Sequence, residues 1–179
     1  WQSRGLGDVY KRQILFGATG GAFWATIPAI LKTKFNTNEI LTSLMLTYVA
    51  LFILDYFVVG PWKDPAGYGL PKSMPFPDAG RLPVLFEGLR VHIGVYFAII
   101  ICFITYIIYN KTLFGFKLKV SGLSSKASQY AGFKYKNLIV YTFIISGACA
   151  GLAGLFEVSG PIGLLYRDIS PNYGFTAII

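Results

Sequence analysis

The sequence has little charge of either sign. Only 13% of its 179 residues are charged, about half the share that is typical of a soluble domain, while 54% are hydrophobic. So few charged side chains cannot cover a water-facing surface, which excludes an ordinary soluble domain. The chain is also too apolar for an intrinsically disordered protein.

Reactive and metal-binding residues are equally scarce. The single histidine is His92, and the two cysteines, Cys102 and Cys149, lie inside apolar runs, where we interpret them as small buried side chains. No CxxC, HExxH or GxSxG motif and no GxxxxGK[ST] phosphate-binding loop occurs. The sequence therefore predicts no metal site, no cofactor bound by this chain and no enzymatic activity, nucleotide hydrolysis included.

Long apolar runs dominate what is present. Four of them approach the ~20 residues that are needed to cross ~30 Å of hydrocarbon, and they cover 14–31, 40–59, 91–109 and 138–158. We predict an all-α integral membrane protein, a polytopic helix bundle, in which 159–175 forms a re-entrant or partial fifth span. The proline-rich stretch 60–90 predicts an ordered loop with a short surface helix near 82–89.

The first 13 residues differ from the rest of the chain. The stretch WQSRGLGDVYKRQ is polar and has neither an initiating methionine nor the apolar region of a signal peptide. Residues 3–13 match the in-frame translation of a transposase-type sequencing adapter, so we expect 1–13 to be an artefact. We expect 14–179 to be an internal part of a longer permease-like protein, because the final GFTAII carries no helix stop signal.

The distribution of lysine predicts the orientation in the membrane. The segment 110–137 contains six lysines and no acidic residue, and the link after the first span is basic too, with Lys32 and Lys34. The positive-inside rule places both segments in the cytoplasm, and alternation of the spans then places 60–90 and 159–173 outside. The net charge of +8 therefore reports topology and does not indicate nucleic-acid binding.

Small residues mark the first and last spans as packing helices. Glycines four residues apart let two helix backbones approach closely in a membrane. The first span has one such pair, and the last span is rich in glycine and alanine in its middle. The predicted packing residues are Gly17, Gly21, Gly147, Gly151 and Gly154.

The segment 110–137 also predicts a short helix. Ser124 or Ser125 offers an N-cap, and Gly132 offers a stop. About two helical turns that carry small residues and one aromatic, Tyr130, cannot bury a core of their own. This helix either fits a groove on a partner or belongs to an ordinary basic loop.

Four stretches carry a more specific resemblance: GGAFWATIPAILKTKFNTNEILTSLML, LFGFKLKVSGLSSKASQYAGF, SGACAGLAGLFEVSG and ISPNYGFTAI. Through them the chain resembles the permease subunit of bacterial ABC importers in the branched-chain amino acid, ribose and nucleoside group, and most of all the nucleoside and simple-sugar branch. In that family a coupling helix of the form Gly-x-Asn-x-x-Ala-Ala, followed by Tyr, Ala and Gly, docks on the ATPase subunit. The resemblance assigns this role, with serine in place of Asn and of the second Ala, to Gly122, Ser124, Ala127, Ser128, Tyr130, Ala131 and Gly132.

The resemblance also implies a function and partners. It implies alternating-access import of a nucleoside or simple sugar across a bacterial plasma membrane. The implied partners are an ATPase subunit that binds ATP and magnesium, a second permease subunit and an extracellular substrate-binding lipoprotein. Thr47 stands where the family usually has Asn. The candidate residues of the translocation path are Trp24, Asn38, Glu39, Thr47 and Asp55.

Two other functions stay open on the residues alone. An ion-coupled carrier needs acidic groups near the middle of the membrane, where Asp55 is the nearest candidate. Asp55 is, however, only five residues from Gly60 and could simply reach the lipid headgroups. A structural membrane protein without transport activity needs neither the basic 110–137 segment nor a re-entrant one.

Overall fold

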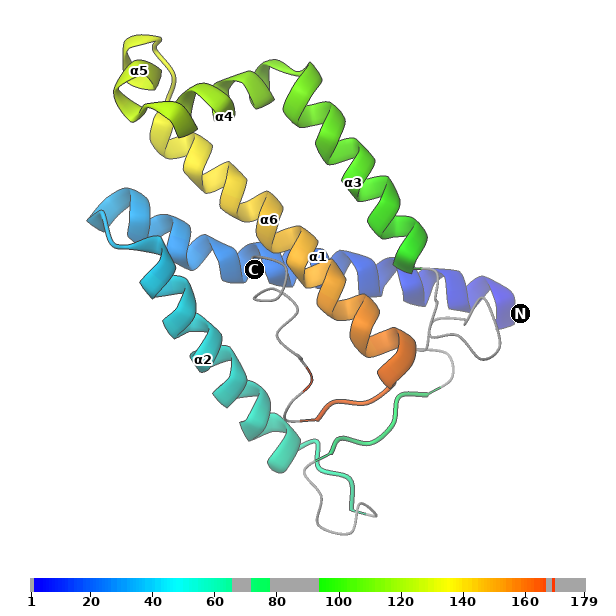
Figure 1. Ribbon diagram of the computed structural model, residues 1–179. Coiled ribbons are helices and arrows are strands. Elements are labelled where there is room, and N and C mark those ends of the chain that lie inside the picture. The colour runs from blue at the N-terminus through cyan, green and yellow to red at the C-terminus, as the bar shows by residue number, and fades with distance from the viewer. Residues whose placement is uncertain (1, 66–71, 78–93, 167–168, 170–179) are drawn as a thin grey trace.

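The computed structural model describes residues 2–65, 72–77, 94–166 and 169, and this part of the chain is a helix bundle (Figure 1). A single π-helical turn, Val158–Ile162, follows the last long helix. The α-helices are α1 (Gln2–Phe35), α2 (Glu39–Val59), α3 (Gly94–Lys111), α4 (Leu113–Leu123), α5 (Ser125–Tyr130) and α6 (Tyr135–Glu157). Four of them, α1, α2, α3 and α6, are long and apolar enough to cross a membrane, which confirms the predicted all-α polytopic class.

The helix bounds follow the predicted spans closely except at the start of the chain. Helix α1 begins at Gln2, well before the predicted start at residue 14. No proline or capping signal interrupts 2–13, so its polar residues extend the helix, and Lys11 lies 3.8 Å from Asp8 one turn earlier. The helix predicted near 82–89 lies outside the described residues, as does most of the predicted re-entrant segment beyond residue 166.

The link between α1 and α2 shows why the second helix begins where it does. The Asn38 side chain accepts a hydrogen bond from the backbone N–H of Ile40 at 3.0 Å, so Asn38 is the N-cap. Glu39 follows in the first turn, and its carboxylate lies 2.5 Å from the ammonium of Lys32 in the last turn of α1. The cap and the ion pair together fix a sharp reversal between two spans.

Helices α1 and α6 cross in direct backbone contact (Figure 1). A Cβ atom on Gly151 would lie 2.9 Å from the Cα of Gly21 and would collide with the carbonyl of Gly17. A Cβ on Gly147 would lie 2.6 Å from the Gly21 carbonyl oxygen. Because real Cβ atoms never approach this closely, only glycine fits at this antiparallel crossing.

Gly154 does not belong to this crossing, contrary to the prediction. A Cβ atom there would meet no atom within 4 Å, so α6 faces open space at Gly154. The reason is helical geometry. Gly154 lies seven residues after Gly147 and therefore on nearly the same face of α6, but it is almost one turn beyond Gly151, where two helices that cross at an angle have moved apart.

The two segments predicted to lie outside the membrane meet at one end of the bundle. The N–H of Ser73 donates to the carbonyl of Leu165 at 2.8 Å, and the N–H of Leu165 donates to the hydroxyl of Ser73 at 2.8 Å. The N–H of Phe76 donates to the carbonyl of Gly163, also at 2.8 Å. These bonds join two segments that are about 90 residues apart in sequence.

The lysine-rich segments gather at the other end. One pocket is lined both by Lys32 and Asn36 at the end of α1 and by Gln129, Lys134 and Lys136. The predicted cytoplasmic link and the predicted cytoplasmic segment 110–137 are therefore neighbours. We call this end of the bundle, formed by 32–36 and 110–137, the lysine-rich end.

A labelling experiment checks the orientation of these two ends. In a chain without Cys102 and Cys149, a cysteine at Met74 should react with a membrane-impermeant maleimide in intact cells, while a cysteine at Ser125 should react only after the cells are opened. Both positions are exposed, so access to reagent depends on the side of the membrane. If instead the cysteine at Ser125 reacts in intact cells and the cysteine at Met74 does not, the predicted topology is inverted.

Candidate docking surface and translocation pocket

The segment 110–137 folds into two helices that connect α3 to α6. Helix α4 runs back from the end of α3 toward the start of α6, and α5 lies beyond it (Figure 1). The Thr112 hydroxyl accepts a hydrogen bond from the N–H of Gly115 at 3.2 Å and caps α4. The sequence predicts only one short helix in this segment, so α4 is an additional element.

Gly115 makes the sharp turn from α3 into α4 sterically feasible. The residue is buried, and a Cβ atom there would collide with the carbonyl oxygen of Tyr109 and lie 2.5 Å from that of Ile108. Any larger residue would push α4 away from the end of α3. The packing role of this glycine was missed because no glycine at the four-residue spacing accompanies it.

Helix α5 begins and ends as predicted. The Ser124 side chain accepts a hydrogen bond from the N–H of Ala127 at 3.2 Å and is therefore the N-cap. At the other end Gly132 has φ +75°, a left-handed conformation that favours glycine. Its N–H donates to the carbonyl of Gln129 at 3.0 Å, which closes the last turn.

The residues assigned to the coupling helix do not all face the same way. Ser128 is fully buried, and its hydroxyl lies 2.8 Å from that of Ser121 on α4, so it holds α5 against α4. The other assigned residues are exposed, and Tyr130 is 94% exposed. A partner can therefore reach a docking surface that consists of Gly122, Ser124, Ala127, Tyr130, Ala131 and Gly132.

The candidate path residues separate into two groups. Trp24 and Thr47 line one pocket of about 430 Å³ that α1, α2 and α6 enclose. Asn38 and Glu39 lie at the lysine-rich end, where both serve the start of α2. Asp55 is half-buried and lies four residues from the end of α2, toward the opposite end of the bundle.

The pocket between α1, α2 and α6 combines aromatic and hydroxyl groups. Besides Trp24 and Thr47 its lining includes Ser43, Phe143 and Ser146, together with the glycines of the α1–α6 crossing. None of the described residues around it is charged. No group of His, Cys, Asp or Glu that could hold a metal ion occurs in the part of the chain that the structure describes.

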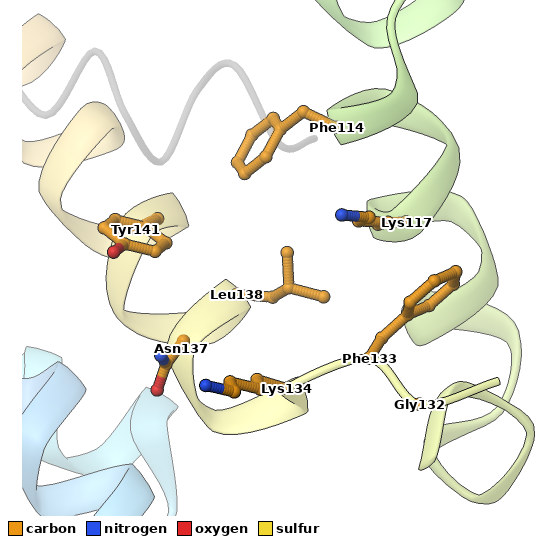
Figure 2. Close-up of a pocket in the computed structure, with 8 residues that line it drawn as sticks. All are labelled: Phe114, Lys117, Gly132, Phe133, Lys134, Asn137, Leu138 and Tyr141. Atoms are coloured by element: carbon orange, nitrogen blue, oxygen red, sulfur yellow. The ribbon is translucent and has the colours of Figure 1, made fainter. Parts of the chain in front are cut away.

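Another pocket at the lysine-rich end, distinct from the one that Lys32 and Lys136 line, was not predicted. It has a volume of about 310 Å³ and lies between α4 and the start of α6. Figure 2 shows Phe114 and Lys117 reaching from α4 toward α6, with Leu138 between the two helices. Its residues lie far apart in sequence, and only the fold of α4 back toward α6 brings them together.

The fold is that of a multi-pass membrane protein, with long apolar helices and a short helix exposed at one end. A family profile described as the permease component of the branched-chain amino acid transport system matches residues 12–179. The chain belongs to this family, whose members are membrane transport subunits. The match begins near the end of the segment 1–13.

Named relatives support the same family. The chain is 37% identical to a glucose ABC transporter permease of Haloferax volcanii, over 92% of this chain and 46% of the relative. It is 33% identical to a guanosine ABC transporter permease of Bacillus subtilis, over 82% of this chain and 42% of the relative. It is 31% identical to a nucleoside ABC transporter permease of Lactococcus lactis, over 79% and 41%. The chain thus spans less than half the length of each relative, and no solved structure gives a significant match.

Proposed function

We propose that this chain forms part of the transmembrane subunit of an ABC importer for a small neutral polar solute. In this proposal a separate ATPase subunit binds ATP and magnesium, and a second permease subunit and an extracellular lipoprotein complete the importer in a bacterial plasma membrane. The observation that carries it is the exposed helix α5 at the lysine-rich end, in a chain whose named relatives are ABC transporter permeases. The proposal concerns the complete permease, since this chain covers less than half of its relatives.

The pocket between α1, α2 and α6 supports a neutral solute. Amino acids are zwitterions at neutral pH, and their recognition needs charged groups or helix termini. The described lining instead offers the ring of Trp24 and the hydroxyls of Ser43 and Thr47. Each hydroxyl already donates to a backbone carbonyl one turn earlier and keeps a lone pair that can accept a hydrogen bond. Such a lining suits the ring and hydroxyl groups of a sugar or nucleoside.

The names of the relatives also state glucose, guanosine and nucleosides as the solutes of those proteins. These molecules share a neutral, hydroxyl-rich ring. We therefore propose a nucleoside or simple sugar as the solute. Trp24 and Thr47 are the residues of this chain that we assign to the path, because the structure brings them to one pocket.

Coupling to the ATPase follows from the position of α5. The Ser121–Ser128 hydrogen bond holds α5 on α4, and the close approach at Gly115 holds α4 on α3. A partner that pushes on the exposed surface of α5 thus moves α4 and α3 with it. Such a rigid-body shift would open the path alternately to the two sides of the membrane.

Transport by the complete permease, produced together with its ATPase and binding-protein subunits, tests the proposal. Cells should accumulate radiolabelled guanosine or glucose, and the ATPase should co-purify with the permease. Accumulation should depend on ATP and persist when an uncoupler removes the proton gradient. Uptake that an uncoupler abolishes would favour the ion-coupled carrier, and a permease that neither transports nor binds an ATPase would favour a structural protein.

A further inference from the structure

The pocket between α4 and α6 has an apolar wall and a basic rim (Figure 2). Phe114, Leu138 and Tyr141 form the wall, while Lys117 and Lys134 form the rim beside Asn137. No acidic residue lines it among the described residues. The pocket is therefore amphipathic, and its charged lining residues are both lysines.

The pocket lies where α6 leaves the membrane. Lys134 immediately precedes α6, and Tyr141 lies two turns into it, so the pocket extends roughly 10 Å along the helix. That distance runs from the polar boundary into the first layer of the hydrocarbon. Phospholipids place their phosphate at this boundary and the start of their acyl chains in this first layer.

The environment of the Lys117 ammonium differs from that of its neighbour Lys119. The Lys119 ammonium donates to the Asn110 side chain at 3.0 Å and lies 4.6 Å from the Tyr109 ring centre. The Lys117 ammonium lies over the Phe133 ring at 5.5 Å, a contact that holds the charge at the pocket and leaves its N–H groups available to an anion.

We propose that this pocket binds the phosphate headgroup of an anionic phospholipid, with Lys117 and Lys134 as the phosphate contacts. Basic pockets between helices at the cytoplasmic side of a membrane are typical sites for anionic headgroups. The apolar wall of Phe114, Leu138 and Tyr141 favours a lipid over a free phosphate ion, because an inorganic ion gains nothing from contact with it. The site requires only that α6 spans the bilayer, so it is independent of the proposed transport activity.

Lipid selectivity of the purified complete permease tests this site. The protein, in a neutral detergent, is mixed with equal amounts of phosphatidylglycerol and phosphatidylcholine with the same acyl chains, and native mass spectrometry measures the lipids bound. Wild type should prefer phosphatidylglycerol on the order of 10-fold, from two lysines near the headgroup. The double variant Lys117→Gln/Lys134→Gln should lose most of this preference.

Two control variants separate the pocket from general charge. Lys111→Gln/Lys126→Gln removes the same charge from exposed positions of the same segment outside the pocket and should keep the preference. Lys117→Arg/Lys134→Arg should keep it too. The proposal is overturned if wild type shows no preference, if both glutamine variants lose it equally, or if the Lys117→Gln/Lys134→Gln protein retains it. Displacement of the lipid by 10 mM inorganic phosphate would show that the site takes a free anion instead.

Discussion

Replacing Gly151 with leucine should separate α1 from α6 and sharply lower the amount of folded protein in the membrane. A Cβ atom at this position already collides with the carbonyl of Gly17 and lies 2.9 Å from the Cα of Gly21, and both are backbone atoms that cannot rotate away. Overpacking of this kind costs roughly 3 kcal/mol or more when the opposing atoms are rigid. Thermal unfolding in detergent and quantitative immunoblotting of membranes measure the two effects.

Gly154 supplies the matched control for this substitution. It lies on the same helix only three residues away, and a side chain there would meet nothing within 4 Å. Gly154→Leu should therefore leave the unfolding temperature and the membrane abundance close to wild type. If both variants lose stability and membrane abundance equally, α6 tolerates no leucine in this region, and the close approach to α1 does not explain the effect of Gly151→Leu.

Replacing Ala127 with glutamate should abolish ATPase co-purification and solute uptake by the complete importer while leaving the permease at normal abundance. Ala127 is exposed on α5, so the new carboxylate is solvated in the free subunit and costs little in folding. In a closely packed interface the same carboxylate would be desolvated without a partner. We expect ATPase binding to weaken about 30-fold, on the order of 2 kcal/mol.

Lys111→Glu is the control for this second substitution. It also places a carboxylate in the lysine-rich segment, at an exposed position in the last turn of α3 and outside α5. Binding and uptake should stay within about twofold of wild type, as is usual for a surface substitution away from an interface. If Ala127→Glu retains both ATPase association and full uptake, α5 is not the docking helix.

Much of the fold could be predicted because the bilayer imposes simple rules on sequence. The four spans follow from the length of the apolar runs. The start of α2 at Asn38 and the start of α5 at Ser124 follow from N-cap chemistry. The meeting of 72–76 with 163–165 agrees with the side of the membrane that the lysine count assigns to both.

The remaining features depend on where along a helix, and on which side of it, a neighbouring element approaches. Composition does not distinguish Gly154, which faces open space, from Gly151, which touches another backbone. It does not distinguish Ser128, which is buried against α4, from the exposed Ala127. Gly115 and the pocket beside Lys117 depend on the fold of α4 back toward α6, which no local pattern in the sequence specifies.

At its centre, the crossing of α1 and α6 brings backbone against backbone at Gly21 and Gly151. This close packing involves Gly17, Gly21, Gly147 and Gly151, and it leaves the two helices little room to move relative to each other. Helix α2 packs against α1 much less extensively than α6 does. Within the described part of the chain, we therefore expect any change in the size of the pocket at Trp24 to come from a shift of α2 relative to the α1–α6 pair.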